Sequence, residues 1–298
     1  MAHGGDGGGS LRLPASACGL VGLKPSRHRL IALEGDDKMP VEIGVPGVMS
    51  RTVRDTCAFM AAAEERFHSP KLPPLGRVDR PTERALRIGV LIDVPTDAVV
   101  EPEVRAATEQ TVALLESLGH RCETIESPIG RQFEQDFILY WAFLALALQR
   151  GGRKIIHPDF DPTGLSPFVA GLANYALRNM HRLPAAVRRL RRSTDLLTNG
   201  FRSNDLIVTP TAARRTPELG YFDINQPFDD LMPKMAQWAC YTPMANSSGL
   251  PAISLPLGHD DEYNLPIGMQ FVARTGHERL LLELALQLEA AQPFRQLA

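Results

Sequence analysis

The stretch from Ala85 to Glu126 limits the fold more than any other part of the sequence. It begins with "ALRIGVLID", an apolar and β-branched run that is typical of a buried strand. A helix is predicted next from "EPEVRAATEQTVALLESLGH", which has proline in its first turn and glycine near its end. The segment 120–126 supplies another strand. Together these segments predict a βαβ unit.

Later segments continue the alternation of strands and helices. Strands are predicted over Asp205–Thr211, Pro251–Leu257 and Pro266–Arg274, which are apolar and bounded by proline or glycine. The leucines of "GHERLLLELALQLEAA" recur at helical spacing. Residues 136–192 read mainly as helices that cover the sheet or wall a pocket. We therefore expect an α/β fold with a mixed β-sheet flanked by helices.

Length and charge limit the possible functions. The 298 residues allow one large domain or two ordinary ones, and the proline-rich segment 70–81 reads as a connector between two ordered parts. The 34 acidic and 32 basic residues nearly cancel, so nucleic acid is not an expected partner. Basic residues over 182–192 are interpreted as a solvated helix face. No stretch approaches the roughly 18 apolar residues of a membrane span, so no membrane partner is expected.

The cysteines and histidines show no metal-binding pattern. Cys18, Cys57, Cys122 and Cys240 lie far apart without a CxxC pair, and the histidines are scattered. The N-terminus also lacks the basic and apolar regions of a signal peptide. We expect reduced thiols, a cytoplasmic location and no structural zinc.

The opening stretch "AHGGDGGGSLRLPASACGLVGLKPS" contains the main chemical signal. A flexible linker would stay polar, whereas here a small and apolar run follows at once. Free N–H groups in a glycine turn bind anions, either a phosphate or the oxyanion of acyl transfer. A P-loop needs lysine where Gly9 stands, and a nucleophile elbow needs glycine where Arg12 stands. A dinucleotide fingerprint is disfavoured because little precedes the glycines and Pro14 follows Ser10 closely.

The same stretch resembles the nucleophile segment of the amidase signature family. That family has Asp-x-Gly-Gly-Ser-[Ile/Leu]-Arg-x-Pro, followed by Cys-Gly and Gly-Leu-Lys-Pro. The matching residues are Asp6, Gly8, Gly9, Ser10, Arg12, Pro14, Cys18, Gly19, Gly22, Lys24 and Pro25. The segment Gly44–Met60 resembles a second family stretch, with Val48 in place of the usual proline. Within the family, "HGGDGGGSLR" most resembles the bacterial amidases around 6-aminohexanoate cyclic-dimer hydrolase.

The resemblance implies a serine amidase that uses a Ser-Ser-Lys mechanism on a small-molecule amide, with neither a metal nor another cofactor. A neutral lysine accepts a proton through a second serine, and the activated nucleophile attacks the amide carbonyl to give an acyl-enzyme. Ser10 matches the nucleophile. The backbone N–H groups of Gly7, Gly8 and Gly9 match the oxyanion hole. Asp6 and Arg12 are assigned to holding this loop by hydrogen bonds, with an ordinary surface pair as the alternative.

The sequence also departs from the family pattern. The lysine and the second serine precede the nucleophile in the family, but the nine residues before Ser10 contain neither. Lys24 matches a structural lysine, and Ser247 and Ser248 match a C-terminal turn. We therefore expect a single amidase domain, 1–298, truncated at its N-terminus and impaired in activity.

The sequence leaves two alternative functions and the oligomeric state open. One alternative is a non-catalytic fragment or pseudoenzyme that binds a ligand or a partner. Another is a serine esterase with His3 or another histidine as its base, which is disfavoured because the sequence has no GxSxG elbow. The sequence does not decide whether the chain forms a homo-oligomer.

Overall fold

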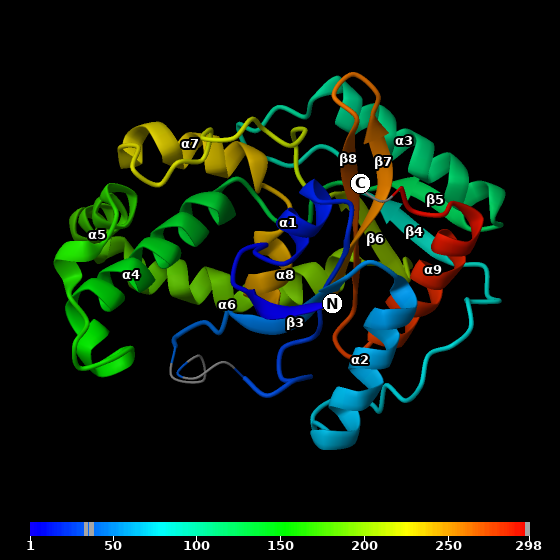
Figure 1. Cartoon of the computed structure of the whole chain (residues 1–298), viewed down its shortest axis with the longest axis horizontal. Helices are drawn as coiled ribbons and strands as arrows, with labels where there is room; N and C mark the ends of the chain where they lie inside the picture. Colours follow the sequence, from blue (N-terminus) through cyan, green and yellow to red (C-terminus); the bar gives the residue numbers. More distant parts are fainter. Residues whose placement is uncertain (33–34, 36–38, 296–298) are drawn as a thin grey trace.

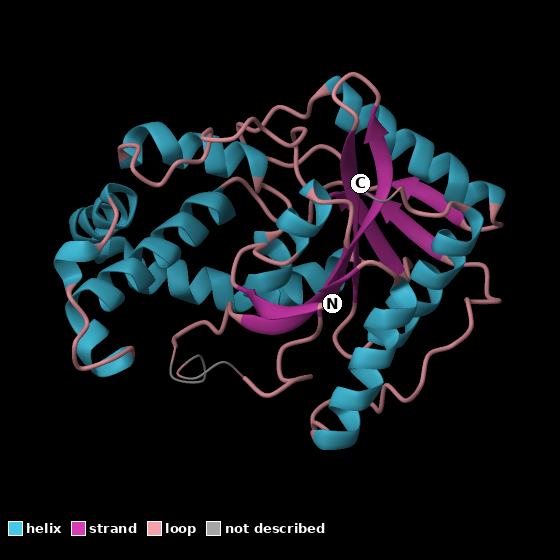
Figure 2. Cartoon of the chain, viewed as in Figure 1, coloured by secondary structure: helices cyan, strands magenta, loops and turns pink. Residues whose placement is uncertain are grey.

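A single mixed sheet runs through the molecule (Figures 1 and 2). The computed structural model describes residues 1–32, 35 and 39–295. Within them the strands lie in the order β1-β3-β2-β7-β8-β6-β4-β5. Their bounds are β1 (Ala2–Asp6), β2 (Val21–Lys24), β3 (Val45–Ser50), β4 (Arg87–Val90), β5 (Arg121–Thr124), β6 (Leu206–Pro210), β7 (Ala252–Asp260) and β8 (Leu265–Ala273). Strand β4 is parallel to β5 and β6, and the other neighbours are antiparallel.

Helices surround this sheet and extend beyond one end of it. Their bounds are α1 (Arg12–Ala17), α2 (Val53–Arg66), α3 (Pro102–Ser117), α4 (Gln132–Ile155), α5 (Pro167–Asn179), α6 (Leu183–Gly200), α7 (Phe228–Trp238), α8 (Pro243–Ser248) and α9 (Glu278–Ala291), with short 3-10 turns η2 (Pro162–Gly164) and η3 (Met180–Arg182). No helix among the described residues is long and apolar enough to cross a membrane.

The predicted βαβ unit is confirmed as β4, α3 and β5. The strands pair in parallel with Arg87 opposite Arg121. Helix α3 has Pro102 at its first position, and Gly119 lies just beyond its end with a φ of +88°. Strands β6, β7 and β8 and helix α9 also lie where they were predicted, and α4, α5 and α6 confirm the helical middle of the chain. The predicted α/β class is therefore confirmed.

The N-terminal elements were not predicted. Strand β1 precedes the glycine turn and α1 follows it, so the expectation that little precedes these glycines was wrong. Pro14 is tolerated in α1 because it lies in the first turn, where an N–H group has no intrahelical partner. The connector 70–81 also does not separate two sheets, since β2 before it pairs with β7 after it.

The two faces of the sheet are covered by different helices. Helices α2, α3 and α9 contribute Met60, Leu115 and Leu284 to the core on one face. On the other face, α6 and α8 contribute Leu197 and Ala245. Helices α4, α5 and α7 form a lobe beyond the sheet, with their own apolar cluster (Figure 1). The glycine turn after β1 faces this lobe.

Candidate active site

The turn that joins β1 to α1 has different steric requirements at each glycine. Gly9 has a φ of +126°, and a Cβ there would lie 2.4 Å from Thr242 Oγ1. A Cβ on Gly8 would lie 3.6 Å from the ring of Phe137, which is an ordinary contact distance. A Cβ on Gly7 would meet no atom within 4 Å. Glycine is therefore required by conformation and space at position 9, whereas position 7 is open.

The carboxylate of Asp6 holds this turn together. It accepts hydrogen bonds from the N–H of Gly9 at 2.7 Å and from the N–H of Leu11 at 3.3 Å. Arg12 binds the same carboxylate with two nitrogens, Nε and Nη2, each at 2.9 Å. Both side chains are fully buried. The pair is thus an internal ion pair, and the surface-pair alternative does not describe it.

Three residues that the sequence did not single out complete this arrangement. Arg12 Nη1 donates to the carbonyl of Thr242 at 2.9 Å and to Gln270 Oε1 at 2.5 Å. Its Nη2 donates to Asn246 Oδ1 at 2.6 Å, and Thr242 Oγ1 donates to the carbonyl of Gly8 at 2.6 Å. We call Asp6, Arg12, Thr242, Asn246 and Gln270 the arginine network. No sequence signal links its two halves, because more than two hundred residues separate them.

The arginine network also sets the charge of Asp6. Burial alone would raise the pKa of the Asp6 carboxyl, but the Arg12 guanidinium and hydrogen bonds from Arg12 and Asn246 outweigh it. The pKa of Asp6 therefore lies well below its usual range. Asp6 stays ionised at neutral pH and keeps accepting the backbone hydrogen bonds of the turn.

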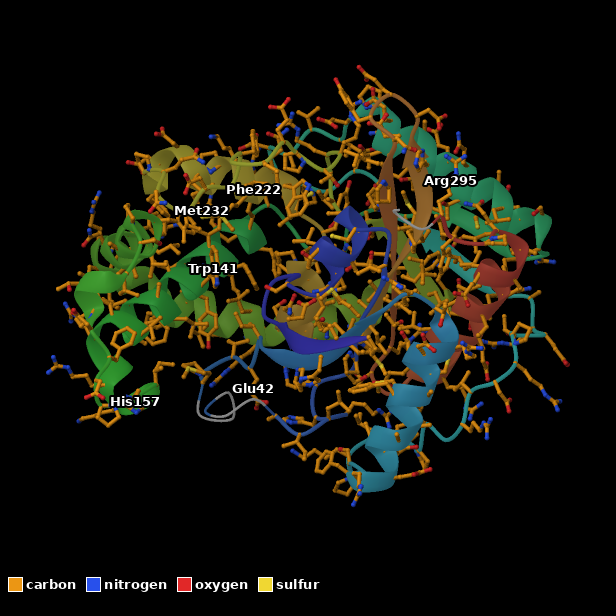
Figure 3. The ribbon with its side chains drawn as sticks, viewed as in Figure 1. Glu42, Trp141, His157, Phe222, Met232 and Arg295 are labelled. Atoms are coloured by element: carbon orange, nitrogen blue, oxygen red, sulfur yellow. The ribbon has the colours of Figure 1, made fainter. Side chains whose placement is uncertain are left out.

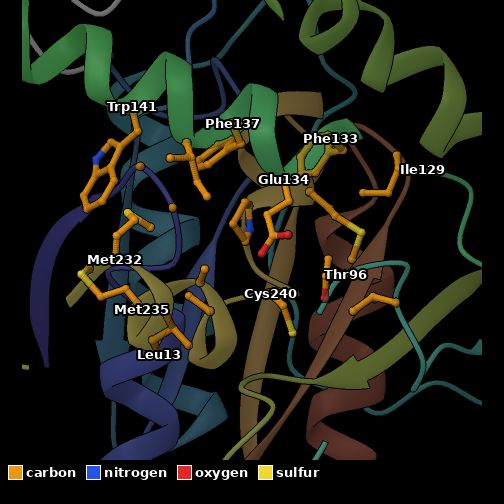
Figure 4. A pocket seen from close by; sticks show the side chains of 18 of the residues that line it. Leu13, Thr96, Ile129, Phe133, Glu134, Phe137, Trp141, Met232, Met235 and Cys240 are labelled. Carbon is orange, nitrogen blue, oxygen red and sulfur yellow. The ribbon is translucent and has the colours of Figure 1, made fainter. Parts of the chain in front are cut away.

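The turn opens into an apolar cavity of about 190 Å³ (Figure 4). Gly7, Gly8 and Ser10 lie at the turn side, and α4 and α7 supply much of the wall. The other lining residues are Leu13, Val94, Pro95, Thr96, Ile129, Gly130, Phe133, Glu134, Phe137, Ile138, Trp141, Met232, Met235, Ala236, Ala239, Cys240, Pro243 and Met244. Figure 3 shows Trp141 and Met232 in the region between α4 and α7. Such a mainly apolar lining suits a small organic ligand.

Ser10 and the neighbouring amides differ in their hydrogen bonding. The Ser10 side chain is exposed, and its hydroxyl has no hydrogen-bond partner within the part of the chain that the structure describes. The same holds for the N–H groups of Gly7 and Gly8. The N–H of Gly9 instead donates to Asp6, which removes it from the set of free donors. Of the three backbone donors that the resemblance implied, those of Gly7 and Gly8 are therefore free among the described residues and that of Gly9 is not.

The other candidate residues lie outside the cavity. His3 is exposed on β1, and its ring lies 6.1 Å from that of Phe59. Lys24 is buried in β2, where its Nζ donates to the carbonyl of Pro25 at 3.0 Å; burial, then the nearby Arg12 charge, lower the pKa of Lys24. The hydroxyls of Ser247 and Ser248 donate to a carbonyl within α8. Among the described residues, those that line the cavity include neither lysine nor histidine.

The described residues also hold no group of three or more histidine, cysteine or acidic side chains that could bind a metal. Among the described lining residues, the cavity has one carboxylate, that of Glu134, and one thiol, that of Cys240. Burial, together with the nearby Glu134 carboxylate, raises the pKa of Cys240, so this side chain is an un-ionised thiol at neutral pH.

These features define an α/β protein with a serine on a glycine-rich turn beside an apolar cavity. The Amidase family model matches residues 1–282. The chain therefore belongs to the amidase family, which carries the amidase signature. This confirms the family resemblance that the nucleophile segment indicated.

Individual relatives agree with this assignment. The chain is 45% identical to the putative amidase AmiC of Mycobacterium leprae over 298 residues, covering all of this chain and 63% of that protein. It is 32% identical to 6-aminohexanoate-cyclic-dimer hydrolase of Pseudomonas sp., covering 99% of this chain and 63% of that protein. A solved structure of 6-aminohexanoate cyclic dimer hydrolase complexed with substrate matches with a TM-score of 0.85 at 31% identity, covering 99% and 65% of the two chains. The chain thus spans less than two thirds of the length of these relatives.

Proposed function

We propose that this chain provides the nucleophile and the acyl-binding cavity of an amidohydrolase that acts on small-molecule carboxamides. One observation carries the proposal: Ser10 lies at the apolar cavity with the unpaired N–H groups of Gly7 and Gly8 beside it. Membership of the amidase family supports the choice of amides as substrates. The proposed chemistry uses no metal or other cofactor.

In the proposed reaction, Ser10 Oγ attacks the amide carbonyl carbon and loses its proton to a base. The carbonyl oxygen becomes an oxyanion, which the N–H groups of Gly7 and Gly8 stabilise. Loss of one such donor typically costs about 3 kcal/mol in the transition state. The C–N bond then breaks, the amine leaves with a proton, and water hydrolyses the acyl-enzyme. Asp6 and Arg12 keep the turn in the geometry that this sequence of steps needs.

The activity of the chain depends on whether a base is available to accept the proton of Ser10. The family resemblance implies a lysine acting through a second serine, and the described residues around the cavity include no lysine. We therefore propose that Ser10 reacts slowly in this chain alone, because a serine without a base is a weak nucleophile. Residual catalysis can still come from the oxyanion donors and from binding. The same observation favours the second candidate, a non-catalytic amidase fragment that binds amide ligands.

Two further proposals concern the chain as a whole. Residues 1–298 are assigned to a single amidase domain, and the pairing of β2 with β7 supports this because it joins the segments on either side of the connector. A cytoplasmic location is supported by the cysteines, since Cys18, Cys57, Cys122 and Cys240 are all free thiols.

Covalent labelling tests the nucleophile directly. The chain is incubated with a fluorophosphonate, and the adduct is located by peptide mass spectrometry. Ser10 is expected to carry the adduct, and Ser10→Ala is expected to abolish it. Ser203→Ala removes an exposed hydroxyl elsewhere and should leave labelling unchanged. An adduct on another residue, or labelling that survives in Ser10→Ala, would reject the proposed nucleophile.

A further inference from the structure

Glu134 is unlike the other residues that line the cavity. It lies in the first turn of α4, and together with Phe137, Ile138 and Trp141 it forms one face of that helix at helical spacing. This face borders the cavity. Figure 4 shows the Glu134 carboxylate extending from α4 into the cavity, toward the wall that contains Cys240. It is the one carboxylate among the described lining residues.

The Glu134 carboxylate has no partner within the described chain. The side chain is half-buried, and neither a hydrogen bond nor an ion pair joins its oxygens to another described group. Burial raises the pKa of Glu134, although the charge of Arg131, one turn earlier, acts in the opposite direction. Arg131 itself forms an ion pair with Asp97. The fold therefore leaves this acidic group poorly compensated.

An acidic side chain in such a place costs stability unless a ligand compensates it. Removing a carboxylate from water is unfavourable without a hydrogen-bonding or cationic partner. Acidic residues also occur in the first turn of helices because the helix dipole favours them there. Interaction with the helix dipole does not require the Glu134 carboxylate to extend into the cavity, whereas binding of a cation in the cavity does.

The remaining walls suit an aliphatic chain that carries a cation. Methionines from α7, Met232 and Met235, provide an adaptable apolar surface. The aromatic rings of Phe133, Phe137 and Trp141 stand on the α4 side of the same cavity. Aromatic faces attract ammonium groups, and they also pack against methylene groups. The cavity thus combines an apolar channel with one anionic group.

We propose that the cavity selects aliphatic amides that bear a terminal ammonium group, and that Glu134 binds this ammonium group as the specificity-determining residue. The inference rests on the proposed function, because Ser10 marks where the scissile amide is held. It goes further by naming the class of amide. Glu134 takes no part in the bond-breaking steps under this proposal.

Calorimetric titration tests the inference without relying on turnover. The full chain carrying Ser10→Ala is titrated at pH 7 with ω-aminoalkanamides of four to seven carbons, and with n-alkanamides of the same lengths. A charge-assisted hydrogen bond predicts that the amino compound of the best-fitting length binds roughly 10-fold to 100-fold more tightly than its alkyl counterpart. Glu134→Gln, added to Ser10→Ala, is expected to bring this ratio close to one.

Control variants separate a binding role from a structural one. Glu218→Gln removes the same charge at an exposed loop position and should leave the ratio unchanged. Thermal melting of Glu134→Gln should match that of the parent, or exceed it slightly. An equal loss of affinity for both ligand series would indicate a structural role and would overturn the inference. So would a parent protein that shows no preference for the amino compounds.

The labelling experiment on the protein with Ser10 intact keeps the two proposals apart. Labelling of Ser10 without an ammonium preference would overturn this inference and leave the proposed function standing. An ammonium preference together with an adduct on a residue other than Ser10 would reject the proposed nucleophile while leaving the cation site supported. An amino-terminated fluorophosphonate should also label Ser10 faster than its alkyl counterpart, and Glu134→Gln should remove that advantage.

Discussion

Two carboxylates on either side of the glycine turn have opposite surroundings. Asp6 is fully buried and accepts hydrogen bonds from Gly9, Leu11, Arg12 and Asn246. Glu134 is half-buried at the cavity and has no partner among the described residues. The fold uses the first charge to fix the backbone, and it leaves the second available to a ligand. Asp6 therefore belongs to the part of the site that supports the glycine turn, and Glu134 belongs to the part that we propose selects the substrate.

The largest expected effect comes from breaking the arginine network. Arg12→Met leaves the Asp6 carboxylate buried without its counter-charge, and such a loss typically costs about 3–5 kcal/mol. The free energy of unfolding, measured by urea titration, should fall by this amount. Because Asp6 also orients the amide of Gly9, labelling of Ser10 should fall as well.

Two control variants sharpen this first prediction. Arg12→Lys keeps the charge but loses the two-pronged contact, so it should fall between the parent and Arg12→Met. Arg77→Met removes one member of an exposed pair with Asp79 and should change stability by no more than about 0.5 kcal/mol. A loss below about 1 kcal/mol in Arg12→Met would contradict the supporting role assigned to the network.

A pair of alanine substitutions tests whether two glycines of the turn differ in their steric requirements. Gly9→Ala places a methyl group against Thr242 Oγ1 at a φ of +126°, so it should cost about 2–3 kcal/mol. Gly7→Ala places its methyl group in open space and should change stability by less than about 1 kcal/mol. Urea titration of both variants gives the comparison. Equal losses of unfolding free energy at positions 9 and 7 would contradict the different steric requirements assigned to these two glycines.

Apolar and periodic patterns in the sequence predicted several strands and helices but gave no sign of strand β1. Leu206–Pro210 and Ala252–Asp260 are apolar and buried on both faces, which makes a strand pattern easy to detect. Strand β1 reads as "AHGGD", and glycine-rich segments carry no side-chain pattern from which a strand can be predicted. Its strand state comes from pairing with β3, where Asp6 lies opposite Val45. That pairing is a tertiary contact and leaves no local signal.

The candidate site, too, was predicted only where its residues lie close together in the sequence. The motif around Ser10 identified the turn because glycine, aspartate and arginine stand at fixed local spacing. Asn246 and Gln270 reach Arg12 from distant parts of the chain, so local spacing could not reveal them. Glu134 is one acidic residue near the start of a predicted helical region. The sequence around it does not show whether its side chain faces a cavity or solvent. Its position depends on how α4 packs beside the turn.

The smallest expected effect is a pH dependence that runs in opposite directions for the two carboxylates. The pKa of Glu134 is raised by burial, so its ionised form disfavours the folded state above the folded pKa. This penalty disappears as the pH falls below the ordinary value of about 4.5. Burial opposes ionisation of Asp6 too, but Arg12 and the hydrogen bonds outweigh it and lower the pKa of Asp6. The stabilising contribution of Asp6 is therefore complete above about pH 5 and is lost as the pH falls.

Glu134→Gln isolates the first of these effects. At pH 7 the variant should be more stable than the parent by less than about 1 kcal/mol, because Glu134 is partly exposed to solvent. The difference should shrink toward zero by about pH 4, since both proteins then carry a neutral group at position 134. Asp6 and the other carboxyls titrate in both proteins, so their contributions cancel in the comparison. Urea titrations across this pH range measure it, and a constant difference, or a variant less stable than the parent at pH 7, would mean that the Glu134 carboxylate is compensated within the fold after all.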